Sequence, residues 1–293
     1  MNASTAKLNI VLSMLIFGTI GIFVRHVPLP SSVIALVRGV VGTLFLLAFS
    51  RLRGTPIGWA AIRRHLLLLV VSGAFIGFNW ILLFEAYRYT TVATATLCYY
   101  LAPVFVILAS PILFRELLTL WKLLCVMAAL VGMVFVSGVL DVGISGAEET
   151  LGILCGVGAA VLYAGVVLMN KKLTQVPGFD RTIVQLGAAA LALLPYVLVT
   201  QRGTVMNWEP RVIALLLIMG IIHTGIAYAM YFGAIKELPA QTSALFSYID
   251  PVSAIILSAL LLGERLTLSG AVGAVLVLGA TLLSELPVGQ KNK

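Results

Sequence analysis

Two charged side chains, Arg38 and Asp250, stand inside long apolar stretches of the sequence. Arg38 lies eight residues after Pro30, which is about 12 Å along a helix. Asp250 follows Ser243 and Ser247, and successive spacings of four and three place these residues on one helical face. If these stretches cross a membrane, both charges are expensive there and predict a functional site.

Each of these charges allows more than one role. Arg38 could contact a substrate, form a structural ion pair with Glu85 or Asp250, or bind backbone carbonyls. Asp250 could relay a proton or bind a substrate amine, because buried acids in carriers often do so. The small and polar face that it shares with the two serines is equally typical of a close helix contact.

Aromatic and polar side chains also occur in the middle of the apolar stretches rather than at their ends. Tyrosine and tryptophan usually gather at membrane interfaces, whereas small-molecule pockets are mainly apolar and aromatic with a few polar groups. Ordinary core packing is the alternative for each of them. The candidates for a substrate cavity are Phe75, Phe78, Asn79, Tyr99, Tyr163, His223, Tyr228, Ser243 and Ser247.

Pro103 and Pro251 fall within two further apolar stretches. A proline inside a helix removes a backbone hydrogen bond and costs about 3 kcal/mol. Such a kink persists in lipid where a neighbour or a cavity satisfies the freed carbonyl. We therefore expect a pair of hinges, with static packing kinks as the alternative.

Several kinds of chemistry are excluded by motifs that the sequence does not contain. No phosphate-binding Gly-x-x-x-x-Gly-Lys-Ser/Thr loop, His-Glu-x-x-His motif or nucleophile elbow is present. Cys98, Cys125 and Cys155 lack zinc-ligand spacing. The net charge of +8 comes with no basic patch interleaved with aromatic residues, so nucleic acid is not expected. We expect no enzyme activity, no cofactor and no metal.

The elements that position these residues are membrane helices. Of the 293 residues, 61% are hydrophobic and only 10% are charged, whereas soluble domains carry about 25% charged residues. A bilayer core needs roughly 20 apolar residues for each helix. The segments that meet this length are 8–24, 31–50, 66–86, 91–113, 118–139, 151–170, 182–200, 211–235, 240–262 and 268–286.

The sequence contains an internal repeat. Shifting it by 148 positions aligns residues 97–120 with residues 245–268 without a gap, and Pro103 then meets Pro251. We therefore expect two five-helix halves, 1–140 and 151–293, joined by an extracytoplasmic linker, 141–150. An odd number of helices in each half makes the halves an inverted pair, which in transporters places the substrate near the midplane.

The flanking charges predict the orientation of this all-helical, ten-span membrane protein. Most of the lysines and arginines between the apolar segments fall on one side, including Arg63 and Arg64, and Lys171, Lys172 and Arg181. The positive-inside rule places that side, and both termini, in the cytoplasm.

The sequence resembles the EamA-type branch of the drug/metabolite transporter superfamily. The resemblance rests on Leu29–Arg38, with its arginine inside the second helix, and on two segments, Leu101–Ala–Pro103 to Glu116 and Ile249–Asp–Pro251 to Glu264. Within that superfamily the sequence is most similar to the YddG-type aromatic amino acid exporters.

The resemblance implies a bacterial inner-membrane exporter that works by alternating access. Its expected substrate is an amino acid, preferentially aromatic or large and apolar, or a similar small metabolite. We expect a monomer in the lipid bilayer. The alternative is a multidrug or cationic-compound exporter of the same superfamily, for which a carboxylate such as Asp250 would be essential. A membrane-embedded enzyme or receptor would need a catalytic constellation or a large binding loop, and the sequence has neither.

Overall fold

The computed structural model describes residues 2–52, 54, 56–90, 95, 98–115, 118–137, 147–262 and 268–283. Throughout these ranges the chain forms helices, turns and short connections, without strands. The helices are α1 (Ala3–Gly18), α2 (Ile20–Arg25), α3 (Ser31–Leu52), α4 (Trp59–Arg64), α5 (Leu66–Tyr89), α7 (Ala102–Phe114), α8 (Leu120–Ser137), α10 (Ala147–Lys172), α11 (Gly178–Thr200), α12 (Pro210–Ile218), the π-helix η1 (Met219–Ile226), α13 (Ala227–Ala234), the 3-10 turn η2 (Ile235–Glu237), α14 (Ala240–Phe246), α15 (Ile249–Leu262) and α16 (Leu268–Leu283).

Length and composition suit these helices to a membrane. Six helical segments of the described chain are long and apolar enough to cross a bilayer: 3–24, 31–52, 66–83, 148–172, 178–200 and 210–237. Residues 102–114, 120–135 and 268–283 form shorter apolar helices. An all-helical membrane fold is therefore confirmed for the described ranges, and the count of ten spans stays a prediction.

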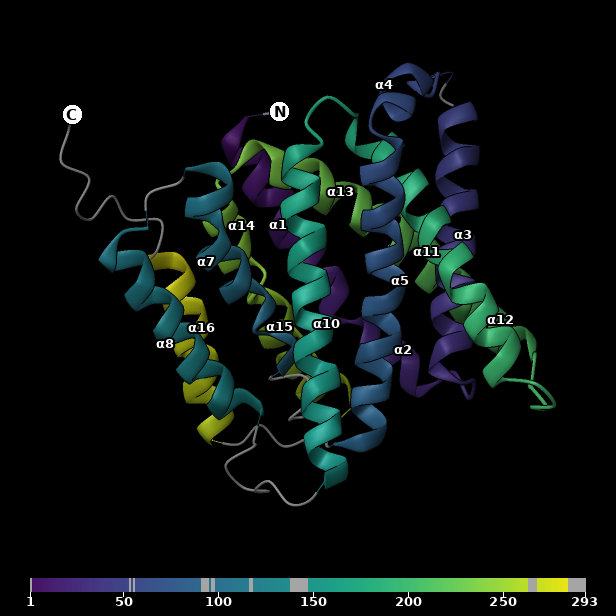
Figure 1. Ribbon diagram of the computed structural model, residues 1–293. Helices are drawn as coiled ribbons and strands as arrows, with labels where there is room; N and C mark the ends of the chain where they lie inside the picture. Colours follow the sequence, from purple (N-terminus) through teal and green to yellow (C-terminus); the bar gives the residue numbers. More distant parts are fainter. Residues whose placement is uncertain are drawn as a thin grey trace.

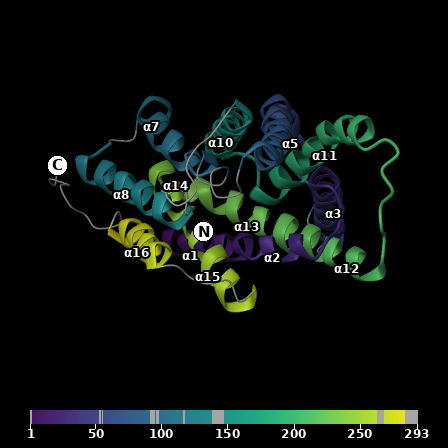
Figure 2. The same ribbon diagram turned by 90° about the horizontal axis from the view of Figure 1, so that it is seen from below.

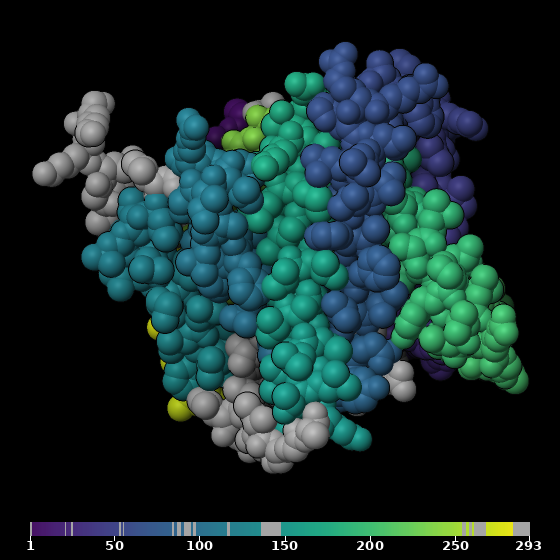
Figure 3. All heavy atoms as spheres, in the orientation of Figure 1, coloured from purple at the N-terminus to yellow at the C-terminus, as the bar shows by residue number. Residues whose placement is uncertain are grey.

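The helices pack side by side, with α8 and α16 as a pair at one edge and α3 and α11 toward the other (Figures 1 and 2). Trp121 Nε1, at the start of α8, donates a hydrogen bond of 2.8 Å to the carbonyl of Leu283 at the end of α16, so this pair is antiparallel. On the face drawn in Figure 3, α10 lies between α7 and α5 and packs against both.

The contacts between helices occur in equivalent pairs when the two halves are compared. The helix α5 packs on α10 and α11, and in the other half α13 packs on α1 while η1 packs on α3. In the same way α7 packs on α10, and α15 packs on α1. The second helices of the two halves, α3 and α11, run antiparallel, because Gly39 approaches Ala190 and Gly42 approaches Leu186. This pairing is the pattern that two inverted halves would produce.

The approach of α5 to α11 is close because Gly73 has no side chain. A Cβ atom at Gly73 would lie 2.5 Å from the backbone oxygen of Gln185 and 2.6 Å from Cβ of Ala188. Small residues are the usual means by which helices approach each other in lipid. Packing therefore explains this glycine.

Pro103 and Pro251 do not lie where the sequence analysis placed them. We expected them inside continuous helices, but Pro103 is the second residue of α7 and Pro251 is the third residue of α15. A turn at Ser247–Tyr248 separates α14 from α15, and a turn at Tyr100–Leu101 precedes α7. In a first helical turn the missing N–H has no partner to lose, so these prolines begin helices instead of kinking them.

Two further expectations fall partly or wholly beyond the described ranges. Of the expected linker 141–150, the residues 141–146 lie outside them, and residues 147–150 already belong to α10. Glu148 and Glu149 occupy the first turn of this helix, where acidic side chains are favourable. The boundary between the linker and the second half stays a prediction. Glu116 and Glu264, which carry part of the family resemblance, also lie outside the described residues.

Candidate functional site

A cavity of about 80 Å³ lies where helical structure is interrupted at two places, by the turn before α7 and by the turn between α14 and α15. It draws its walls from both halves of the chain. The lining residues are Met14 and Phe17 of α1, Arg38 of α3, Tyr99, Tyr100, Ala102 and Pro103 around the start of α7, Tyr163 of α10, Tyr228 of α13, and Ser247 and Asp250 around the start of α15.

The two breaks contribute equivalent positions to this cavity. Under the shift of 148 residues Tyr99 aligns with Ser247 and Ala102 aligns with Asp250, and all four line the cavity. The repeat therefore brings the same two positions of each half to one place. The residues at those positions differ, so the two walls offer different chemistry: a phenol and a methyl group on one side, a hydroxyl and a carboxyl on the other.

Four of the eleven residues that line the cavity are tyrosines. The ring of Tyr99 lies 5.6 Å from that of Tyr163 and 5.8 Å from that of Tyr100, measured between centroids. Tyr228 meets Phe17 edge to face at 5.3 Å. These separations suit aromatic contacts, so the wall presents flat apolar faces that carry hydroxyl groups.

Arg38 is buried, with 7% of its surface exposed. Its Nε donates a hydrogen bond of 3.1 Å to Oγ1 of Thr224, and its guanidinium lies 5.4 Å from the ring centroid of Trp80. No acidic side chain of the described chain forms a salt bridge with it. Glu85, which we considered as its partner, instead accepts a hydrogen bond of 2.7 Å from the Tyr196 hydroxyl.

Asp250 reaches the cavity from the first turn of α15. Tyr100 lines the same cavity. The hydroxyl of Ser247 lies 3.2 Å from that of Tyr231 and donates a 3.0 Å hydrogen bond to the carbonyl of Ser243. Because the turn at Ser247–Tyr248 interrupts the helix, Ser243 does not share a continuous face with Asp250, and it does not line the cavity.

Five more of the predicted site residues lie away from the cavity lining. Phe78 is 51% exposed on the outer surface of α5, and Phe75 packs in the main apolar core. Asn79 is buried and donates a 2.7 Å hydrogen bond to the carbonyl of Ala159, with the Tyr99 hydroxyl 3.5 Å from its Oδ1. His223 lies 2.8 Å from Oγ1 of Thr19. Pro251, next to Asp250, is also not part of the lining.

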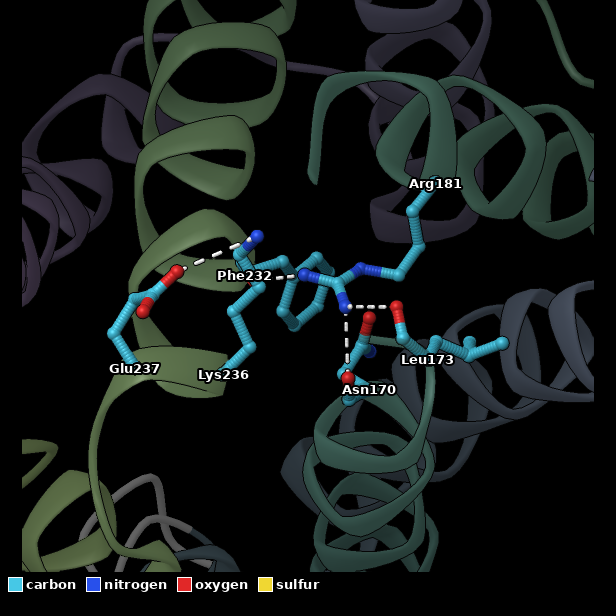
Figure 4. A network of polar contacts seen from close by, with 6 residues as sticks. All are labelled: Asn170, Leu173, Arg181, Phe232, Lys236 and Glu237. Carbon is cyan, nitrogen blue, oxygen red and sulfur yellow. Dashed lines mark hydrogen bonds and ion pairs between the residues drawn. The ribbon is translucent and has the colours of Figure 1, made fainter. Parts of the chain in front are cut away.

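The sequence analysis placed Arg181 in a connection, but it is fully buried in the first turn of α11. Its guanidinium donates hydrogen bonds to the carbonyls of Asn170 at 2.7 Å and Leu173 at 3.2 Å, and also to the carbonyl of Phe232 (Figure 4). The carbonyls of Asn170 and Leu173 belong to the end of α10, where a helix carries partial negative charge. Arg181 thus links α10, α11 and α13. No sequence pattern indicated this role, because it depends on packing that brings the end of α10 and a carbonyl 51 positions away to the same guanidinium.

No group of three or more His, Cys, Asp or Glu side chains in the described ranges could hold a metal ion. Cys98, Cys125 and Cys155 are free thiols. The cavity can therefore act through one guanidinium, one carboxyl, hydroxyl groups and aromatic faces. These groups suit reversible binding of a small polar molecule with an apolar part.

Comparison with known proteins identifies the kind of protein to which this cavity belongs. The EamA-like transporter family matches twice along the chain, at residues 5–138 and 150–286. The uncharacterized transporter YxxF of Bacillus subtilis (strain 168) is 30% identical over 287 residues, which cover 96% of this chain and 89% of that protein. An uncharacterized transporter of Archaeoglobus fulgidus is 29% identical and covers 94% of each chain.

More distant similarity extends over the whole length. The uncharacterized inner membrane transporter YicL of Salmonella typhimurium is 23% identical, with 97% of this chain and 96% of that protein covered. A solved crystal structure superposes with a TM-score of 0.85 at 20% identity, covering 97% of this chain and 98% of the other. At that identity the superposition shows the fold alone.

Proposed function

Because the chain belongs to the EamA-like transporter family, as a multi-pass transporter of the bacterial inner membrane and not an enzyme, we propose that it exports amino acids. The preferred substrates are aromatic or large and apolar, and similar small metabolites follow the same route. The observation that carries this proposal is one cavity in which tyrosine rings from both halves surround a guanidinium and a carboxyl. A free amino acid offers a group complementary to each of these.

The size of the cavity argues for a transport cycle with more than one conformation. Ligand pockets usually measure about 300–1,000 Å³, whereas this cavity measures about 80 Å³. An aromatic amino acid therefore requires the walls to move apart before it can bind. The breaks before α7 and between α14 and α15 border the cavity, and we propose that Pro103 and Pro251 mark the hinges there.

The organisation of the chain supports alternating access. We propose ten spans in two inverted halves, 1–140 and 151–293, with a linker within 141–150 and both termini in the cytoplasm. The equivalent packing pairs and the antiparallel run of α3 against α11 support the inversion. We further propose that the monomer is the transporting unit, since residues of one chain surround the cavity.

Flux measurements on purified protein test this function. In proteoliposomes, labelled phenylalanine, tryptophan, methionine and threonine should cross faster than in protein-free liposomes, with the aromatic substrates fastest. A variant tests the role of the cavity: Tyr163→Ala removes one of the lining side chains and should lower the flux of phenylalanine. The amino acid proposal is wrong if none of these compounds crosses faster than in protein-free liposomes.

The carboxyl of Asp250 in the cavity favours one second candidate, a multidrug or cationic-compound exporter. The same proteoliposomes distinguish the two functions. An amino acid exporter should leave labelled tetraphenylphosphonium at the background rate, whereas a cation exporter should move it and should stop doing so when Asp250→Asn is introduced.

A further inference from the structure

The guanidinium of Arg38 is held on two of its sides and left open on a third. Thr224 accepts the hydrogen bond from Nε, and Cζ of the group lies over the Trp80 ring, 5.4 Å from its centroid. The two terminal nitrogens make no hydrogen bond to a described residue. Because Arg38 also lines the cavity, its open edge is available to a molecule bound there.

Thr224 fixes the orientation of this edge, because its hydroxyl hydrogen bonds elsewhere and its oxygen accepts from Arg38. Its hydroxyl donates a 3.0 Å hydrogen bond to the carbonyl of Met219, five residues earlier in the π-helix η1. A hydroxyl has only one hydrogen to donate, so its oxygen is left to accept from Arg38 Nε. The wide turn of the π-helix η1 thus positions Oγ1 of Thr224 to accept from Nε of Arg38. Such π-helical turns are often found at functional sites.

Close packing of α3 against η1 keeps the arginine and the threonine together. Gly42 lies one turn after Arg38, and a Cβ atom there would lie 3.1 Å from Cγ2 of Thr224 and 3.2 Å from the carbonyl oxygen of Gly220. A side chain at Gly42 would require these neighbours to move. The hydrogen bond between Arg38 and Thr224 therefore depends on a helix contact with little room to adjust.

We propose that Arg38 is the carboxylate-binding residue of the substrate site and that Thr224 is its positioning residue. The two terminal N–H groups of a guanidinium form parallel hydrogen bonds with a carboxylate. A buried cation without a protein counter-ion gains most from an anionic ligand. The proposal rests on the proposed function and narrows it: the substrates share a carboxylate beside an apolar or aromatic group, and amines without a carboxylate are excluded.

Competition on the wild-type protein tests the carboxylate requirement without any variant. Unlabelled 3-phenylpropionate should inhibit the flux of labelled phenylalanine, whereas phenethylamine and phenylalaninamide should inhibit at least tenfold more weakly, since a lost hydrogen bond to a charged group costs about a factor of ten or more. Equal inhibition by phenethylamine and 3-phenylpropionate would overturn the proposal.

Variants of Thr224 test the positioning role. Thr224→Val removes the acceptor and keeps the shape, so the KM for phenylalanine should rise about tenfold with little change in kcat, and Thr224→Ser should restore it. Thr43→Val is the matched control, because Thr43 lies on the same helix as Arg38 and its hydroxyl bonds only to the carbonyl of Gly39. Identical KM values for Thr224→Val and Thr43→Val would contradict the proposal.

Direct binding separates this inference from the proposed function. Purified wild-type protein should bind 3-phenylpropionate, and the tryptophan fluorescence of the protein follows this binding. Arg38→Met should weaken the binding at least tenfold. If amino acids do not cross the membrane but this Arg38-dependent binding is observed, only the proposed function fails. If amino acids cross and Arg38→Met still binds 3-phenylpropionate with unchanged affinity, only the Arg38 inference fails.

Discussion

Arg181 offers the sharpest test of how this fold is held together. Its guanidinium is fully buried and donates hydrogen bonds to three backbone carbonyls, those of Asn170, Leu173 and Phe232 (Figure 4). Replacing Arg181 with Met keeps an unbranched aliphatic stem but removes the guanidinium and all three of its donated hydrogen bonds. We expect the variant to fold with the same topology and with lower stability, because α10, α11 and α13 lose their shared polar contact.

The size of this loss follows from what the carbonyls retain. An unpaired buried acceptor costs about 1–3 kcal/mol. The carbonyl of Asn170 keeps a 3.3 Å hydrogen bond from the Leu173 N–H, and that of Leu173 keeps one of 3.3 Å from the Val176 N–H. The lower end of the range therefore applies to these two carbonyls. Counting about 1 kcal/mol for each of the three carbonyls, including that of Phe232, we expect Arg181→Met to lower the free energy of unfolding by about 3 kcal/mol in total.

Three free cysteines make this loss measurable without labels. Cys98 and Cys125 are buried and Cys155 is half-buried, so a thiol-reactive fluorophore reports their exposure as the detergent-solubilised protein unfolds. At about 2–4 °C per kcal/mol, Tm should fall by about 6–12 °C.

The matched control for this experiment is Arg63→Met, the same substitution at an exposed arginine of α4. It should leave Tm within about 2 °C of wild type, since most surface substitutions have small effects. If Arg181→Met melts together with Arg63→Met, the three hydrogen bonds do not stabilise the fold and the reasoning is refuted.

Two further predictions concern helix packing and the cavity. Gly73→Ala should lower Tm, because the new methyl group would lie 2.5 Å from a backbone oxygen. The control Gly279→Ala, whose methyl group would have nothing within 4 Å, should leave Tm unchanged or slightly raised. Equal Tm values for the two variants would contradict the close approach of α5 to α11. In a background without native cysteines, Tyr99→Cys and Ser247→Cys should react with a hydrophilic thiol reagent, and phenylalanine should protect both thiols. Phe78→Cys, on the outer surface, should not react. Unreactive thiols at both cavity positions would argue against a shared water-filled site.

The general architecture was predictable because its signals are local. Apolar runs of about 20 residues indicate membrane helices wherever they occur, and the repeat at 148 residues can be found by comparing the sequence with itself. The same local information placed Pro103 and Pro251 only approximately. A proline is compatible with a helix start as well as a helix interior, and the turns at Tyr100–Leu101 and Ser247–Tyr248 have no strong sequence marker.

The candidate site was predictable in part. Arg38, Tyr99, Tyr163, Tyr228, Ser247 and Asp250 line one cavity, and the two charged ones belong to types that are rare in membrane spans. That they bind a substrate stays a prediction. Phe78 could not be separated from them by type, because an aromatic side chain suits both a cavity wall and the outer surface of a membrane helix. Which side of α5 faces inward depends on α10 and α11, which pack against it.

The sequence by itself determined the class of the protein, its repeated halves and the two charged residues inside apolar stretches, because hydrophobicity and self-similarity are properties of the chain alone. Only the tertiary structure decided what those charges meet: Arg38 meets Thr224 and Trp80 and not Glu85, and Arg181 meets three carbonyls in the interior. The physical reason is that a buried charge takes its partners from whichever segments packing brings beside it, and these partners lie up to 186 positions away in the chain.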